Sequence, residues 1–525
     1  MTSFTRSVVR RPALALAALA LAVGSLTGCG GASAAGGDTT LDIQFAGPPI
    51  TGLDPAKSGG GGSMIYSTLA YDPLIFMQPD GTLVPDLAES WRWADDGYTA
   101  FELTLRTGVK FSDGTEMTAE GVAQWLKYFK EGKATQSSNL ATMTEARAVD
   151  ATTVQITLSE PDPDFPALLS QQYPTGLVAA PAGMNEPGSL DAATNGTGPY
   201  TLDPAETVTG DHYTYVPNPH YWNPNGIVYD KVVVHVISDP NTIVSAMSAG
   251  QLDIALGSPS TATTAESAGI EVQSVPGRVV GLYLLDREGT LAPELGDVKV
   301  RQAINYAIDR ESISAALNPD GFADPTSQMG LPQQVGFDPA LDTIYPYDPQ
   351  KARQLLAEAG HPDGISFEVT CASVLNLCPY AQAVATSLAS AGITMTINEE
   401  SEVSSFNQKF AGGEAPAVMF QSAGPAFRMA RGLTRPDVLA NPFDTQDPEI
   451  EAAYQQLATT GEDAAGPAWQ ALVRLLADRG WFAPVERPHT VVFSKGVDNV
   501  TVTERFPGYY AAIDPTGTHT WRPAP

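Results

Sequence analysis

Segments with the period of a β-strand alternate with segments with the period of an α-helix along this chain of 525 residues. FELTLRTGV, from Phe101, and TTVQITL, from Thr152, alternate apolar and polar residues, which is typical of strands with one buried face. Between them, TAEGVAQWLKYFKEG is predicted to be a helix that Thr118 caps. Its buried face would carry Val122, Trp125, Leu126 and Phe129. Such alternation favours an α/β architecture.

Further segments follow the same pattern. LDIQFAG, from Leu41, is predicted to be the first strand, and the Gly-rich loop PPITGLDPAKSGGGGS follows it. GDVKVRQAINYAIDR is predicted to be a helix capped by Asp297, with a buried stripe of Val300, Ile304, Ala307 and Ile308. DPQKARQLLAEAG is predicted to be a helix with Asp348 as N-cap, Pro349 at its first position and Gly360 after its end. Its inward face would carry Ala352, Leu355, Leu356 and Ala359.

The length of the chain bears on how many domains it forms. Single hydrophobic cores stop growing at about 250–300 residues, so two or three domains are expected. No repeat period and no long low-complexity linker follows Gly37. We therefore expect domains that are joined by crossing strands and packed closely, with the crossings able to act as a hinge.

The N-terminus has the layout of an export signal. Three arginines precede an apolar run from Ala13 to Val23, which is shorter than the about 20 residues that span a bilayer. LTGC, residues 26–29, resembles the bacterial lipobox, which implies cleavage after residue 28 and a diacylglycerol on Cys29. Residues 29–37 would then form a flexible tether, and two acyl chains would anchor the protein to the outer face of the cytoplasmic membrane. The alternative is an ordinary signal peptide followed by a free or disulfide-bonded cysteine.

The formal net charge is −30, with 59 acidic and 29 basic residues. This balance argues against a nucleic-acid partner, because phosphates are neutralised by Lys and Arg. It also argues against docking of a basic patch on anionic lipid. Solubility near a membrane and attraction of cationic ligands both remain open as reasons for the charge.

Two cysteines lie close together in TCASVLNLCPY, at Cys371 and Cys378. Outside the cytoplasm a nearby pair is expected to be oxidised, so a local disulfide is predicted. Two separate buried thiols are the alternative, because sequence does not show whether the two Cβ atoms face each other.

The sequence carries none of the common hydrolase or nucleotide-binding motifs. There is no Gly-x-Ser-x-Gly elbow, no His-Glu-x-x-His and no phosphate-binding loop, and the six histidines form no i, i+4 pair. Asp95 and Asp96 could imitate a catalytic pair but lie in a predicted turn. We therefore expect no catalytic residues, no cofactor and no preformed metal site.

Eight stretches together resemble the family 5 extracellular solute-binding proteins of bacterial ABC importers, the peptide- and nickel-binding class. They occur in the order of the family and cover most of the chain. They are LDPA, YDPLIFMQPDGTLVPDLAESWRWADDG, FELTLRTGVKFSDGTEMTAEGV, GTGPY, NPHYW, AGQLDIA, VRQAINYAIDR and YDPQKARQLLAEAG. Within them, Trp91, Trp93 and Trp222 are expected to pack the scaffold rather than to stack on a ligand.

The resemblance implies a bilobed α/β fold of the periplasmic-binding-protein type (type II, cluster C-like). Lobe I would comprise residues 38–275 and 488–525, with an extra subdomain inserted at about 71–195, and lobe II would comprise 276–487. The crossings near SVPGRVV and ERPHTVV would form the hinge. A ligand that touches both lobes would stabilise the closed form, as in a Venus flytrap.

The resemblance also implies a function. The protein would be the substrate-binding component of an ABC importer, a monomer that captures an oligopeptide or similar polar solute and delivers it to permease and ATPase subunits. One alternative is a receptor for a non-peptide ligand, such as an anionic solute, a metal chelate or haem. Another is a ligand-sensing or chaperone-like surface lipoprotein without a transport role.

One stretch departs from the peptide-binding members. They hold the ligand's amino terminus with an acidic residue after a late strand of lobe II, but residues 416–437 lack an Asp near the strand end. This stretch offers Arg428 and Arg431 instead, which suit a carboxylate or phosphate or are simply solvated. Ligands of open α/β sheets bind beyond the carboxyl ends of strands. The predicted ligand-binding residues are Ala46, Gly47, Pro48, Ser258, Phe420, Gln421 and Arg428.

Overall fold

The computed structural model describes residues 39–49, 52–58, 64–132, 135–436, 438–461, 464–502, 514, 517 and 519–525. The predicted export signal, Cys29 and the predicted tether lie outside these residues.

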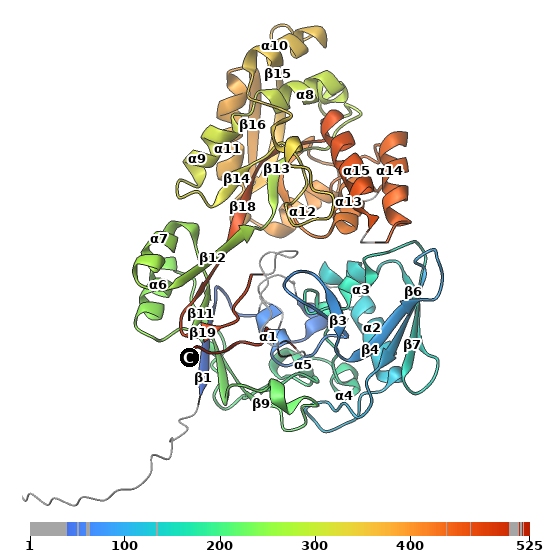
Figure 1. Cartoon of the computed structure of the whole chain (residues 1–525). Helices are drawn as coiled ribbons and strands as arrows, with labels where there is room; N and C mark the ends of the chain where they lie inside the picture. The colour runs from blue at the N-terminus through green and yellow to red at the C-terminus, as the bar shows by residue number, and fades with distance from the viewer. Residues whose placement is uncertain are drawn as a thin grey trace, which may run out of the picture. The chain divides into compact units, whose positions relative to one another are not determined.

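The described strands include a mixed sheet of twelve, shown in Figure 1. Its main path runs β16-β15-β17-β13-β18-β11-β1-β10-β9-β8, and β12 and β14 also pair with β18. The bounds are β1 (Thr40–Phe45), β8 (Tyr200–Leu202), β9 (His212–Pro217), β10 (Lys231–Val236), β11 (Ile254–Leu256), β12 (Glu271–Pro276), β13 (Val279–Leu284), β14 (Ala323–Pro325), β15 (Ile365–Ala372), β16 (Ile393–Glu400), β17 (Ala417–Ser422) and β18 (Phe482–Ser494).

Strand β18 joins two regions of this sheet. Its first half pairs with β13 and β14, and its second half pairs with β11 and β12. We call β1, β8–β12 and the second half of β18 the first sheet region, and β13–β17 with the first half of β18 the second sheet region. The two crossings predicted as a hinge lie side by side, because Pro276 of β12 pairs with His489 of β18.

The first sheet region forms around the predicted first strand, which is confirmed as β1. Leu41 and Ile43 point into the core and are almost fully buried. β1 pairs in parallel with β10 over its whole length. Polar residues alternate with these apolar ones, as the burial of one face requires.

A four-stranded antiparallel sheet, in the order β4-β5-β7-β6, follows β1 in the chain. Its bounds are β4 (Ala88–Trp93), β5 (Ala100–Leu105), β6 (Met143–Ala148) and β7 (Thr153–Leu158). Helix α2 (Ala119–Glu131) packs on it with its four predicted inward residues fully buried. Thr118 Oγ1 accepts a hydrogen bond from the backbone N–H of Gly121 at 3.1 Å, so the predicted cap is confirmed.

Trp91, Trp93 and Trp222 pack, as predicted, against the hydrophobic core that includes Leu41 and Ile43 of β1. Trp222 Nε1 donates to Asp72 Oδ2 at 2.8 Å, and the Arg106 guanidinium lies 4.2 Å from the centroid of the Trp222 ring. Asp95 accepts hydrogen bonds from the backbone N–H groups of Thr99 and Ala100, which fits the predicted turn.

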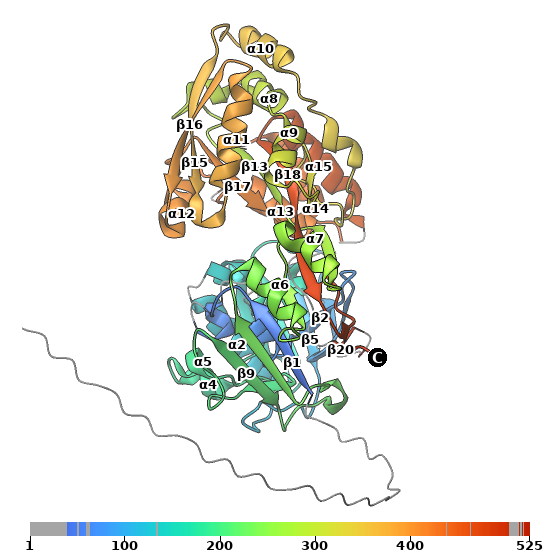
Figure 2. The ribbon, with the colours of Figure 1, turned by 90° about the vertical axis from the view of Figure 1, so that its left-hand side faces the viewer.

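The second sheet region carries apolar side chains on both faces. Val280, Leu282 and Leu284 of β13 belong to the apolar cluster that includes residues of α8, α10 and α11, whereas Val279 and Tyr283 belong to the cluster that includes residues of α12–α15. Figure 2 shows these helices around the second sheet region. The sequence of β13, VVGLYL, is a continuous apolar run, which is typical of a strand that is covered on both faces. A Cβ on Gly281 would lie 2.6 Å from Pro484 Cα, so the approach of β13 to β18 requires glycine there.

The two predicted helices of this region form, with one difference. Asp297 Oδ1 accepts from the Lys299 N–H, and Asp348 Oδ1 accepts from the N–H groups of Gln350 and Lys351, so both caps are confirmed. The first helix, α8 (Val298–Tyr306), ends earlier than predicted, because a new helix, α9 (Arg310–Leu317), begins with Asp309 as its cap. The second helix is α10 (Pro349–Glu358).

The remaining elements are short or lie on the flanks of the sheets. The other α-helices are α1 (Ile65–Thr68), α3 (Phe165–Leu168), α4 (Pro181–Asn185), α5 (Ser189–Ala192), α6 (Pro240–Ser248), α7 (Pro259–Ser267), α11 (Cys378–Ala389), α12 (Val403–Ala411), α13 (Ala426–Thr434), α14 (Pro448–Ala458) and α15 (Gly466–Asp478). The other strands are β2 (Ile75–Met77), β3 (Leu83–Pro85), β19 (Val497–Asp498) and β20 (Arg522–Pro523). The 3₁₀ helices are η1 (Pro55–Lys57), η3 (Thr135–Leu140), η4 (Pro174–Gly176), η5 (Pro224–Gly226), η6 (Pro293–Gly296), η7 (Pro339–Thr343) and η8 (Ser373–Leu375). None of the helices in the described part of the chain has the length and apolarity that a bilayer crossing needs.

Candidate functional site

A cavity of about 380 Å³ is lined by residues from both sheet regions. This volume falls in the range of roughly 300–1,000 Å³ that small-molecule sites occupy. Its polar lining includes Ser258, Arg278, Asn318, Asn376, Tyr380 and Gln421.

The ends of strands bring two predicted ligand-binding residues to this cavity. Ser258 follows β11 directly and is the N-cap residue of α7. Gln421 lies one residue before the end of β17, where it pairs with Val280 of β13. Ser258 and Gln421 thus line the same cavity, as expected if the ends of the strands gather at one site.

One wall of the cavity is a loop closed by a disulfide. Cys371 lies at the end of β15 and Cys378 begins α11, and the two are bonded with their Cα atoms 5.3 Å apart. The loop between them contains η8 and then Asn376, which has a left-handed backbone with φ of 56°. Leu375, Asn376 and Leu377 all line the cavity, so the disulfide limits how far this wall can move.

A buried carboxylate, that of Glu486, holds two residues of the cavity lining, Tyr380 and Asn318. Glu486 is fully buried, and its Oε1 accepts hydrogen bonds from Tyr380 Oη at 2.6 Å and from Asn318 Nδ2 at 2.5 Å. Burial, followed by the negative charge of Glu486, raises the pKa of the Tyr380 hydroxyl above its usual range. Tyr380 therefore stays a neutral hydrogen-bond donor at physiological pH.

His489 closes the edge of the cavity near the hinge crossings. Its Nδ1 lies 3.3 Å from Ser274 Oγ and its Nε2 lies 3.3 Å from Asp324 Oδ2. The hydrogen bond to His489 lowers the pKa of the Asp324 carboxyl. Among the described residues, no group of three or more His, Cys, Asp or Glu side chains is arranged to hold a metal ion.

Four other predicted ligand-binding residues are not part of the cavity lining. Ala46, Gly47 and Pro48 follow β1, and the Gly47 carbonyl accepts a hydrogen bond from Tyr66 Oη at 2.9 Å. Phe420 packs its ring against aromatic rings of the second sheet region instead, those of Tyr283, Phe406 and Phe410. Their roles in ligand binding stay predictions.

Arg428, the seventh predicted residue, is also absent from this lining. It lies on α13 and forms an ion pair with Asp162, which follows β7 in the first part of the chain. The Asp162 side chain is 0 % exposed and that of Arg428 is 15 % exposed. Burial raises the pKa of Asp162, against the opposing effect of the positive charges of Arg428 and Arg431.

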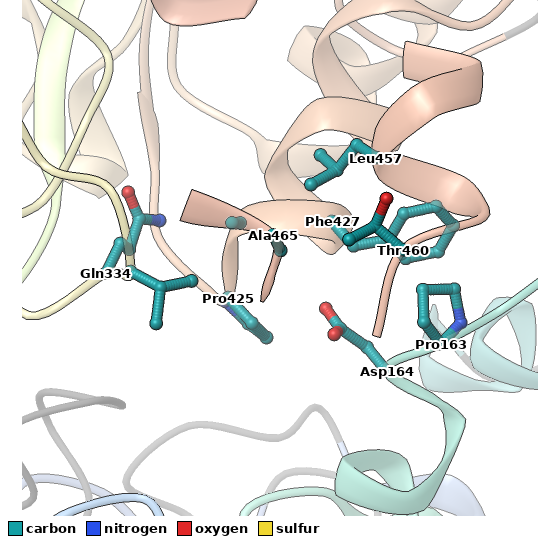
Figure 3. Close-up of a pocket in the computed structure, with 10 residues that line it drawn as sticks. Pro163, Asp164, Gln334, Pro425, Phe427, Leu457, Thr460 and Ala465 are labelled. Atoms are coloured by element: carbon teal, nitrogen blue, oxygen red, sulfur yellow. The ribbon is translucent and has the colours of Figure 1, made fainter. Parts of the chain in front are cut away.

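A narrow crevice, shown in Figure 3, is lined by Pro163 and Phe427, the sequence neighbours of Asp162 and Arg428. Pro163 and Asp164 face Pro425 and Phe427 across it. Its free volume of about 10 Å³ is close to the minimum for one water molecule. The crevice is therefore too small to be the solute site, and of these two the cavity of about 380 Å³ is the better candidate.

Sequence reasoning did not identify Arg278, Asn318, Asn376 or Tyr380. Arg278 lies within the predicted crossing SVPGRVV, so a basic residue inside a hinge segment was an available signal. The other three reach the cavity only through tertiary packing of α9, η8 and α11.

Comparison with known proteins gives a family match and distant structural matches. A model of the bacterial extracellular solute-binding proteins, family 5 Middle, matches residues 82–434. The glutathione-binding protein GsiB of Escherichia coli strain K12 is 30 % identical over 365 residues, which is 67 % of this chain and 66 % of the relative. For GsiB of Escherichia coli O1:K1, the matched part spans 62 % of the relative's length.

The solved structures establish the fold. HbpA2 from Haemophilus parasuis has a TM-score of 0.77 at 22 % identity and covers 90 % of this chain and 99 % of its own. AgaA from A. tumefaciens R10, in complex with agropinic acid, has a TM-score of 0.76 at 23 % identity, covering 93 % and 99 %. The fold is thus the bilobed α/β binding-protein type that the resemblance implied. With a family model matching more than half of its length, the chain belongs to the family 5 bacterial extracellular solute-binding proteins.

Proposed function

We propose that this protein is the substrate-binding component of an ABC importer and that it captures a small polar solute in the cavity between its two sheet regions. The single observation that carries this proposal is that Ser258 of the first region and Gln421 of the second line one cavity. A solute in contact with both regions stabilises the closed form, since it interacts with that form more strongly than with an open one. When the closed form reopens, the solute is released to the permease and ATPase subunits.

An oligopeptide or a similar solute fits the polar lining. Hydroxyl and amide groups from Ser258, Asn318, Asn376, Tyr380 and Gln421 can bond the amides of a peptide backbone. The name of the GsiB relatives, glutathione-binding protein, supports a peptide-like solute. The AgaA complex with agropinic acid supports an opine as the second candidate.

We extend the proposal to the domains and the anchor. The two lobes comprise residues 38–275 with 488–525, and 276–487, and they close about the paired crossings of β12 and β18. A lipid on Cys29 holds the exported monomer at the outer face of the membrane. Cys29→Ser should release the protein into the soluble fraction of cells, and retention of the variant in the membrane fraction would contradict this anchor.

Thermal unfolding tests the binding function. The purified protein is heated alone and with reduced glutathione, trialanine or agropinic acid. A solute at 100 times its Kd should add about 2.7 kcal/mol to the free energy of unfolding. Chromatography after incubation should recover the solute unchanged, since the family comprises binding proteins. Absence of a shift with every solute, or chemical turnover of one, would contradict the proposal.

A further inference from the structure

Arg278 differs from every other arginine in the described part of the chain. Each of the others makes a hydrogen bond, an ion pair or a ring contact through its guanidinium. The Arg278 side chain makes no hydrogen bond, ion pair or ring contact with the described residues.

The backbone at Arg278 is held in place, although its exposed side chain is unpaired among the described residues. It lies between β12 and β13, and both neighbours, Gly277 and Val279, are buried. The Gly277 N–H donates to the Pro488 carbonyl at 2.9 Å, which holds this turn against β18. The backbone thus places the Arg278 side chain reproducibly at the cavity.

The surroundings of Arg278 favour an anion that comes from outside the chain. Arg278 lines the cavity with Tyr380 and Gln421, which are neutral, and with one exposed acidic residue, Asp320, to which it forms no ion pair. Glu486, the buried acid nearby, accepts hydrogen bonds from Tyr380 and Asn318 through Oε1, whereas its Oε2 has no hydrogen-bond partner among the described residues. Arg278 is exposed to the cavity, and partial desolvation by its neighbours lowers its pKa, so an anionic partner there would stabilise the charged guanidinium.

We propose that Arg278 binds a carboxylate of the solute, so that the transported molecule is anionic at the end that lies against the hinge crossings. This inference rests on the proposed function and adds the chemical class of the solute and the residue that selects it. A guanidinium presents two parallel N–H donors that match the two oxygens of a carboxylate. Asn376 and Gln421 would then bond the neutral remainder of the solute.

Calorimetric titration of three proteins tests this assignment: wild type, Arg278→Gln and Arg353→Gln. Arg353 is an exposed arginine on α10 that donates to the Ser390 carbonyl, so its replacement changes the net charge equally but away from the cavity. The probes are reduced glutathione, trialanine, the C-terminal amide of trialanine and inorganic phosphate. The amide isolates the contribution of the peptide carboxylate.

Arg278→Gln should weaken binding of the carboxylate probe by at least about 30-fold, as expected for loss of a charge-assisted hydrogen bond. Arg353→Gln should leave that affinity unchanged. The amide should bind weakly, and equally to wild type and Arg278→Gln. The melting temperature of the unliganded Arg278→Gln protein should match wild type, because the exposed side chain makes no hydrogen bond or ion pair in the part of the chain that the structure describes.

Four results overturn the assignment. Equal affinity of wild type and Arg278→Gln for the carboxylate probe would remove Arg278 from the site while leaving the proposed function intact. Equal loss in Arg353→Gln would show a general charge effect. Binding of phosphate alone would exclude a carboxylate as the recognised group. Binding of none of these probes by wild type would overturn the carboxylate class and count against the proposed peptide-like solute itself.

Discussion

Replacing Arg428 by glutamine tests the ion pair that ties α13 to the segment after β7. The Asp162 carboxylate is fully buried and is paired with Arg428, whereas Arg431 interacts with it only through its charge. Loss of one partner of a buried pair costs about 3–5 kcal/mol, because the other charge stays buried without compensation. Arg428 keeps 15 % of its side chain exposed. We therefore expect Arg428→Gln to lower the free energy of unfolding by about 3 kcal/mol, the lower end of that range.

A double-mutant cycle separates the pair from the effects of each substitution. The free energy of unfolding is measured by urea denaturation for Arg428→Gln, Asp162→Asn and the double variant. Because both groups form one interaction, the double variant should lose about 1–3 kcal/mol less than the sum of the single losses. Arg474→Gln is the control, since the Arg474–Asp478 pair is exposed and worth about 0.5 kcal/mol or less. Fluorescence and circular dichroism should report coincident transitions.

One outcome would refute this reasoning directly. If Arg428→Gln unfolds at the same urea concentration as wild type but binds its solute more than about tenfold more weakly, Arg428 contacts the solute instead. That outcome is the one the sequence predicts for an anion-binding Arg428. Additive losses in the cycle would likewise show that Arg428 and Asp162 do not stabilise each other.

Three further predictions concern the disulfide, pH and the cavity wall. Replacing Cys371 and Cys378 by serine should lower the free energy of unfolding by about 2.5 kcal/mol, because the unfolded chain gains the entropy of the opened loop. The same replacement should weaken solute binding, and an unchanged urea midpoint together with an unchanged affinity would contradict this. Burial raises the pKa of Asp72 to about 7. The stabilisation that protonated Asp72 provides is therefore complete below about pH 4 and is lost as pH rises through about 7, so Asp72→Asn should flatten the stability profile between about pH 4 and 7, and an unaltered slope would refute it. Tyr380→Phe leaves Glu486 with one donor fewer and should cost about 1–3 kcal/mol in urea denaturation, whereas a loss below measurement error would show that this bond contributes little.

Local signals in the sequence were sufficient for much of the fold. The α2 face and the caps at Thr118, Asp297 and Asp348 depend on residues within one or two helical turns, and all were confirmed. The end of α8 was missed because Ala307 and Ile308 continue the buried stripe after the helix has stopped at Tyr306.

The site was harder to predict because it depends on contacts between distant parts of the chain. Ser258 and Gln421 were identified since each lies at a strand end, a property visible in the local pattern. The sequence could not show the ion pair of Arg428, because its partner, Asp162, lies 266 residues away, and the role of Arg428 in ligand binding stays a prediction. Arg278 was missed because its place in the cavity lining, and its lack of a partner among the described residues, depend on contacts between distant parts of the chain.

The central claim is that a solute binds in the cavity lined by Ser258, Arg278 and Gln421. The most direct measurement is a crystal structure of the protein with the solute retained from its native host, identified by mass spectrometry of the same sample. We predict electron density for an intact solute in this cavity, with a carboxylate against Arg278 and contacts to both sheet regions. Solute density elsewhere on the molecule, or in this cavity but touching only one sheet region, would contradict the account.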